Sequence, residues 1–335
     1  MTLFSIVFIL LLFIDCALKY YLNQRQISAI NRSFNQVPAA FHSQISLEEH
    51  HKAGRYSLAK LNLGKIELIY GVILVLIFTL GGGIDKIAQL TQFSNYPISS
   101  EVGLIIVYSL ISSALGLPLS YYSTFKIEQA FGFNKMTLGL FIKDLIKGTL
   151  LGLIIGVPLL YLVMWLMNSL GATWWLWVWG VMVIFNLLIL TIYPTFIAPL
   201  FNKFTPLEDL ELKARIETLL SECGFKSQGV FVMDGSKRSS HGNAYFTGLG
   251  ASKRIVFFDT LLKQLSHDEI IAVLAHELGH FKHKHILKQM LTSFGIMLVG
   301  LFVFSLLINQ SWFYAGLNIS QINPASGLLL LFILT

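Results

Sequence analysis

The chain has 335 residues, of which 55% are apolar and only 13% are charged. Soluble globular domains carry about 25% charged residues, so an ordinary soluble enzyme does not fit this composition. The apolar content also excludes intrinsic disorder. The two cysteines, Cys16 and Cys223, are too few for a disulfide framework, and we expect free thiols. The composition therefore predicts a polytopic membrane protein.

Six apolar runs are long enough to cross a bilayer, which takes about 20 mostly apolar residues. They cover residues 2–20, 66–84, 102–122, 149–167, 174–193 and 287–308. A seventh run starts near Gly327 and is too short to cross, so we expect the natural protein to continue through this span. The first run lacks the basic flank and cleavage site of a signal peptide, and we expect it to be retained.

Basic residues are distributed unevenly between the loops that join these runs. Of the 24 Lys and Arg residues, 23 lie in loops on one side, and only Lys86 lies on the other. The positive-inside rule then places the N-terminus outside and the large loops in the cytosol. The net charge of +6 is interpreted as a marker of topology, and no nucleic-acid partner is expected.

The long polar stretch before the sixth run has a globular composition and predicts a small α+β module. The expected elements are a helix over 206–223 and strands over 229–233, within 239–246 and over 254–258. Ser266 and Glu269 form a capping box that opens a last helix, which we expect to continue into the sixth span. The expected domains are a membrane domain over 1–193, a catalytic domain over 194–286, and the sixth span with a partial seventh over 287–335.

The last helix carries an HExxH motif made of His276, Glu277 and His280. Histidines four residues apart lie on one helix face, where two imidazoles can bind one Zn²⁺. Glu277 can take a proton from a zinc-activated water as general base and pass it to the leaving amine. An apolar stripe is expected on the opposite face: Ile270, Ile271, Leu274, Leu278 and Phe281. The motif predicts zinc-dependent peptide hydrolysis; a histidine-rich helix end without metal is the alternative.

The sequence shows no clear third zinc ligand. The continuation HExxHxxGxxH is absent, because His283 and Ile286 stand in place of its Gly and its last His. His283 would lie about 10.5 Å along the helix axis from the first motif histidine, too far to share one ion. We therefore interpret His283 and His285 as supporting groups.

No Asp or Glu follows Glu277 in the sequence. We expect the third ligand, a Glu from another helix, to lie beyond residue 335. The upstream carboxylates Asp259 and Asp268 are the alternative.

Four stretches resemble the integral-membrane CAAX prenyl endopeptidases, a family of zinc metallopeptidases, and suggest a bacterial member. They are FKIEQAFGFNKMT (125–137), YPTFIAPLFNKFTPL (193–207), SSHGNAYFTG with KRIVFFDTLL (239–262), and HELGHFKHKH (276–285). Many zinc proteases share HExxH, whereas the FGFNKMT, NAYF and FDTLL elements are more discriminating.

The resemblance implies a mainly α fold, in which a ring of seven transmembrane helices surrounds a water-filled chamber under a small gluzincin-like α+β catalytic domain. It implies that His276 and His280 bind zinc, that Glu277 is catalytic, and that a downstream Glu completes the site. It also implies an edge strand that adds the substrate backbone, formed by Asn243, Ala244 and Tyr245. A plain turn residue after Gly242 is the alternative for Asn243.

The expected function is that of a membrane-embedded zinc metalloendopeptidase of the CAAX-processing type, acting on peptide or protein substrates in a bacterial inner membrane. Eukaryotic members cleave the C-terminal tripeptide from prenylated proteins, and a bacterial member is not expected to meet such substrates. Without the downstream Glu, the given polypeptide should bind zinc weakly or be inactive. The alternatives are a heat-shock-type quality-control zinc protease, which would have fewer spans, and a transporter or receptor that binds metal without catalysis.

Overall fold

The computed structural model describes residues 2–93, 95–225, 227–247 and 253–334. The chain divides into two compact units. The first comprises Met1–Phe131, Leu153–Ala172 and Val303–Thr335, and the second comprises Gly132–Gly152 and Thr173–Phe302. Two long helices, α5 (Leu138–Ser169) and α11 (His285–Leu307), contribute residues to both units.

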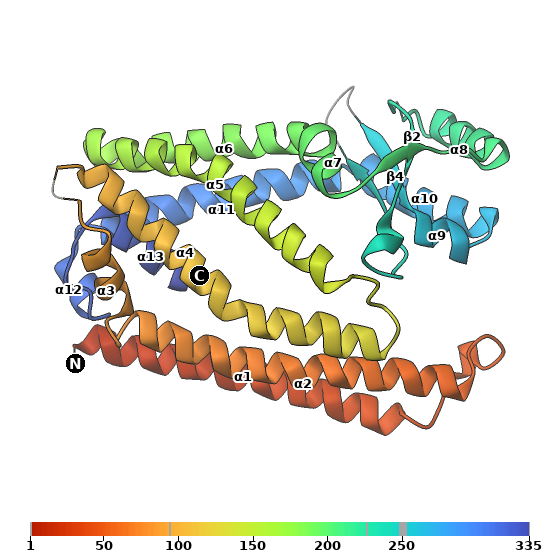
Figure 1. Cartoon of the computed structure of the whole chain (residues 1–335), viewed down its shortest axis with the longest axis horizontal. Coiled ribbons are helices and arrows are strands. Elements are labelled where there is room, and N and C mark those ends of the chain that lie inside the picture. Colours follow the sequence, from red (N-terminus) through yellow and green to blue (C-terminus); the bar gives the residue numbers. More distant parts are fainter. Residues whose placement is uncertain (1, 94, 226, 248–252, 335) are drawn as a thin grey trace. The chain divides into compact units, whose positions relative to one another are not determined.

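The first unit is built of helices. Helices α1 (Leu3–Ser33) and α2 (Leu47–Phe78) pack side by side along their length, joined by a loop with the short helix η1 (Ala39–Phe41) (Figure 1). Helix α4 (Pro97–Tyr122) continues into the π-helical turn η2 (Ser123–Glu128). The short helices α3 (Gly83–Leu90) and α13 (Pro324–Leu334) both pack against α4, and α12 (Ser311–Ala315) precedes α13.

Among the described residues, six helices are long and apolar enough to cross a membrane, which confirms the six expected spans. These helices are longer than the apolar runs, because helical turns of polar residues extend them at their ends. The first run was expected to end at residue 20, but α1 continues to Ser33, and α2 begins with the capping box of Ser46 and Glu49. The seventh run forms α13, an apolar helix of 11 residues.

The helices of the second unit include a nearly continuous run from α6 (Trp174–Ile192) through η4 (Tyr193–Ile197) to α7 (Ala198–Phe201). The short helix η3 (Gly171–Thr173) straddles the boundary between the two units and leads into this run. The indole nitrogen of Trp179 donates a hydrogen bond to the carbonyl of Phe294 (2.9 Å), which joins α6 to α11.

A four-stranded mixed sheet follows this run, in the order β1-β2-β4-β3. Its strands are β1 (Phe204–Pro206), β2 (Val230–Met233), β3 (Ala244–Thr247) and β4 (Arg254–Phe258). Strand β2 runs parallel to β4, while β1 and β3 are antiparallel to their neighbours. The last three strands confirm the sequence prediction; β1 was not predicted. It has only three residues and ends in Pro206, a residue that sheets admit at their edges.

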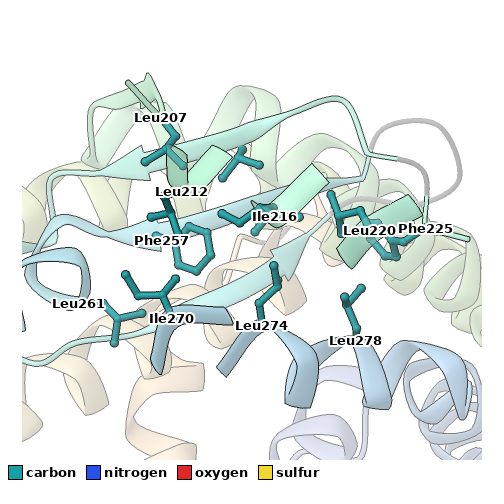
Figure 2. Packing of buried hydrophobic residues seen from close by; sticks show 12 residues of the cluster. Leu207, Leu212, Ile216, Leu220, Phe225, Phe257, Leu261, Ile270, Leu274 and Leu278 are labelled. Carbon is teal, nitrogen blue, oxygen red and sulfur yellow. The ribbon is translucent and has the colours of Figure 1, made fainter. Parts of the chain in front are cut away.

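A buried cluster holds the helices α8 (Leu210–Glu222) and α10 (His267–Lys282) against this sheet (Figure 2). Its members recur every four residues along each helix: Leu212, Ile216 and Leu220 on α8, and Ile270, Leu274 and Leu278 on α10. Ile255 and Phe257 join them from one face of β4. Ile271 is partly buried against the cluster, whereas the side chain of Phe281 lies outside the described residues.

The helix that carries HExxH does not continue into the sixth span as expected. Helix α10 ends at Lys282 and α11 begins at His285, and between them Lys284 has a φ of 54°. A residue in this left-handed region cannot continue a right-handed helix. The prediction of one continuous helix was therefore wrong.

Candidate metal centre

The orientation of the HExxH motif follows from the packing of α10. Leu274 and Leu278 lie on one face of this helix and are buried in the cluster beneath the sheet. His276 and His280 lie on the opposite face, where both are exposed, and Glu277 between them is partly buried. Since the apolar face is fixed by its burial, the two imidazoles are held outside the hydrophobic core.

The two motif histidines converge on one point. Their Nε2 atoms lie 3.3 Å apart, and their ring centroids lie 4.9 Å apart. Two nitrogens bound to one zinc ion at about 2.0–2.1 Å, in tetrahedral geometry, are separated by roughly 3.3 Å. The pair therefore has the spacing that two ligands of a single zinc ion require.

His285, the first residue of α11, contacts the second motif histidine across the break between the two helices. A hydrogen bond of 2.8 Å joins Nδ1 of His280 to Nδ1 of His285. If His280 binds metal through Nε2, its proton resides on Nδ1, and His280 is the donor in this bond. His283 stacks on His285, with ring centroids 5.6 Å apart.

The described residues contain no group of three side chains arranged to hold a metal ion. The two upstream carboxylates are engaged elsewhere. Asp259 accepts hydrogen bonds from the backbone N–H (2.8 Å) and the hydroxyl of Ser236, and Asp268 pairs with Arg215. Two imidazoles with the spacing of zinc ligands are therefore present among the described residues, and no third side chain joins them there.

The three predicted substrate residues lie at one edge of the sheet. Ala244 and Tyr245 belong to β3, opposite Phe257 and Val256 of β4, and the carbonyl of Asn243 accepts a hydrogen bond from the N–H of Phe258 (2.9 Å). In the described part of the chain, β3 has a neighbouring strand on one side only. Helix α10 packs against β3, so this edge lies beside the motif helix.

Tyr245 is held as a neutral phenol. Burial, reinforced by the nearby Tyr193, raises the pKa of Tyr245 to about 12. Its hydroxyl lies 3.9 Å from Sδ of Met233 on β2. Tyr245 thus fixes the strand by packing across the sheet and carries no charge at neutral pH.

A distant loop braces the segment before β3, a contact that no local pattern in the sequence predicts. In this pairing the N–H of Lys135 donates to the carbonyl of Arg238, and the N–H of Ser240 donates to the carbonyl of Phe133, each at 3.0 Å. The rings of Phe133 and His241 stack with centroids 4.3 Å apart. The FGFNKMT element therefore contributes a backbone pairing that positions the chain entering the edge strand.

An ion pair anchors the same segment to α5. The guanidinium of Arg238 donates to both carboxylate oxygens of Asp144 at 2.7 and 3.0 Å. It also donates to Oδ1 of Asn202 (2.6 Å) and to the carbonyl of Phe201 (2.7 Å). Arg238 thus joins three stretches that the sequence separates widely.

Comparison with known proteins agrees with this architecture. Residues 26–203 match the family model of the CAAX prenyl protease N-terminal region with five membrane helices, and residues 206–334 match peptidase family M48. CAAX prenyl protease 1 of Saccharomyces cerevisiae is 40% identical over 285 residues, which cover 82% of this chain and 62% of the yeast protein. The Dictyostelium discoideum homologue is 39% identical over 88% of this chain and 71% of its own length.

A solved structure is similar over the whole chain. The crystal structure of S. mikatae Ste24p superimposes with a TM-score of 0.91 at 35% identity, covering 100% of this chain and 82% of that one. The chain spans slightly less than two thirds of the length of the Saccharomyces cerevisiae relative. It belongs to the CAAX prenyl protease family of integral-membrane M48 zinc metallopeptidases.

Proposed function

We propose that this protein is a zinc metalloendopeptidase that hydrolyses peptide bonds at the membrane. The observation that carries the proposal is the 3.3 Å separation of the Nε2 atoms of His276 and His280, with Glu277 between them on the same helix. Membership of the M48 family supports the assignment of zinc as the metal.

In this proposal the residues of α10 have two roles, metal binding and proton transfer. His276 and His280 hold the metal, and the bond from His280 to His285 fixes the orientation of one ligand ring. When bound, zinc acidifies a water molecule and polarises the scissile carbonyl. Glu277 accepts the proton of the attacking water and later donates it to the leaving amine. The third protein ligand of this proposal is a glutamate outside the described residues.

The edge of β3 is the proposed substrate site. An extended peptide can add as a further strand along Asn243, Ala244 and Tyr245, because backbone groups at a sheet edge are free to pair. The packing of β3 against α10 supports this assignment, since an added strand would pass beside the motif helix. Pairing through the backbone accommodates many side chains, so the site suits a range of peptide or protein substrates.

The proposed setting is a bacterial inner membrane, with the N-terminus outside and the catalytic domain over 194–286 in the cytosol. The distribution of basic residues supports this orientation, with 23 of 24 in loops on one side. Processing of CAAX-type substrates is proposed from the relatives, which are described as CAAX prenyl proteases.

Cleavage by the Glu277→Gln variant tests the reaction. The purified full-length protein in lipid nanodiscs is incubated with a prenylated peptide and a panel of unmodified peptides, and products are identified by mass spectrometry. Glu277→Gln should lose cleavage by at least a hundredfold while retaining zinc, because the general base is removed and both histidines remain. The control is Glu217→Gln on the exposed face of α8, which should cleave normally. Cleavage by Glu277→Gln at the wild-type rate would refute the proposal.

A further inference from the structure

A basic cavity of about 480 Å³ lies within the second unit, between the first turns of α5, the end of α7 and the turn that carries η5 (Gly235–Lys237). Five basic side chains line it: Lys143, Lys147, Lys203, Lys237 and Arg238. Two acidic residues, Asp144 and Asp234, also line it, which leaves a net charge of +3. Cavities of this size accommodate small ligands, and this charge favours an anion.

The acidic residues of the cavity are already engaged. Asp144 accepts two hydrogen bonds from the guanidinium of Arg238. Oδ1 of Asp234 accepts a hydrogen bond from the backbone N–H of Lys203 at 2.7 Å. The ammonium groups of Lys143, Lys203 and Lys237 form no ion pair within the described part of the chain, and all three residues are exposed. These three lysines are thus available to a ligand.

The cavity lies at the polar end of two candidate membrane spans. Lys147 is the last charged residue of α5, and residues 148–169 carry none. The span Gly171–Phe201 also carries no charge, and Lys203 is the first basic residue after it. The ammonium group of Lys147 donates to the carbonyl of Leu200 at 2.7 Å, which holds the two ends together. Charged residues at such a boundary lie at the level of the lipid headgroups.

Exposed apolar side chains lie next to these lysines. Ile146 and Leu150 on α5 and Leu200 on α7 are 53%, 55% and 50% exposed, respectively. Leu200 also lines the cavity. A ligand with a phosphate at the lysines and hydrocarbon along these side chains would match both surfaces.

We propose that this cavity binds the headgroup of an anionic phospholipid from the adjacent leaflet. The lipid phosphate contacts Lys143, Lys203 and Lys237, and its acyl chains lie along Leu150 and Leu200. Basic pockets next to membrane helices recognise anionic headgroups in this way, and each basic side chain strengthens binding on the order of fivefold. The site is separate from the HExxH motif and does not depend on peptide hydrolysis.

Native mass spectrometry of the purified protein tests the proposal with phosphatidylglycerol and phosphatidylcholine of identical acyl chains. The wild type should retain one phosphatidylglycerol more strongly than phosphatidylcholine. The triple variant Lys143→Gln/Lys203→Gln/Lys237→Gln should bind phosphatidylglycerol about a hundredfold more weakly, from three losses of roughly fivefold. Replacing the same lysines with Arg should preserve binding, which shows that the charge matters and that the site remains folded.

A matched control replaces three exposed lysines that do not line the cavity: Lys52→Gln/Lys213→Gln/Lys263→Gln. This variant should bind phosphatidylglycerol like the wild type. Equal weakening in both triple variants, or equal retention of the two lipids by the wild type, would overturn the proposal. Inorganic phosphate at millimolar concentration should displace bound phosphatidylglycerol less effectively than added lipid does. Equal displacement by the two would also overturn the proposal, because the site would then recognise a free anion.

Discussion

The Nε2 atoms of His276 and His280 lie 3.3 Å apart on the face of α10 opposite the buried Leu274 and Leu278. The apolar residues anchor the helix to the sheet, and the motif face is oriented as a consequence. The spacing of two zinc-bound imidazoles is therefore present in the fold itself. The geometry of the proposed metal site therefore depends on the same periodicity that builds the hydrophobic core.

Removal of His285 should weaken zinc binding without removing a ligand. The 2.8 Å bond between the Nδ1 atoms orients the ring of His280, and loss of such partners typically lowers metal affinity by about 10–100-fold. We expect His285→Ala to show this loss in competition titrations against a chromogenic chelator. His285→Gln, which retains an acceptor, should fall between Ala and wild type. Unchanged affinity in His285→Ala would show that the bond does not position the ligand.

Truncation of Leu274 should destabilise the module around the sheet. Leu274 is 1% exposed within the cluster, and replacing such a leucine with alanine costs about 2–5 kcal/mol. The free energy of unfolding can be measured by denaturant titration, followed by intrinsic fluorescence. Leu210→Ala is the matched control, because this residue is 78% exposed and should change stability by less than about 0.5 kcal/mol. Similar losses in both variants would contradict the assigned core.

The pair of Arg238 and Asp144 should show energetic coupling. Both side chains are about one fifth exposed and are joined by two hydrogen bonds, and such charged bonds contribute about 1.5–3 kcal/mol. A double-mutant cycle with Arg238→Ala and Asp144→Ala should therefore give a coupling free energy of about 2 kcal/mol. Additive effects of the two substitutions would show that the pair does not stabilise the segment before β3.

Asp259 should stabilise the fold at neutral pH and lose that effect in acid. Burial opposes ionisation, but the hydrogen bonds from Ser236 outweigh it and hold the pKa of Asp259 below its usual value. A lowered pKa means that the stabilisation is present above the unfolded-state value of about 3.9 and disappears as the pH falls through the folded-state value. Asp259→Ala should therefore melt at a lower temperature than wild type at pH 7. The difference in melting temperature should shrink below about pH 4. A difference that stays constant from pH 7 to below about pH 4 would show that ionisation of Asp259 does not stabilise the fold.

The sequence predicted those features that depend on local periodicity. The six spans, β2, β4 and the buried stripe of α10 all follow from apolar spacing, and the capping box of Ser266 and Glu269 forms as expected. Strand β1 was missed because three residues ending in proline give no alternating pattern. The break at Lys284 was missed because no Gly or Pro marks it, yet it is this break that brings His285 to His280.

The contacts that brace the edge strand could not be predicted, because they join segments about a hundred residues apart. The pairing of Lys135 with Arg238 and the stack of Phe133 on His241 depend on tertiary structure alone. The resemblance to the family identified the FGFNKMT element as discriminating, and its physical role became evident only from these contacts.

X-ray absorption at the zinc edge of the purified full-length protein tests the central claim most directly. The account predicts bound zinc with scattering from two imidazoles at about 2.0–2.1 Å, unchanged in Glu277→Gln and lost in a variant that combines His276→Ala with His280→Ala. Absence of zinc, or a site dominated by sulfur at about 2.3 Å from Cys16 or Cys223, would contradict it.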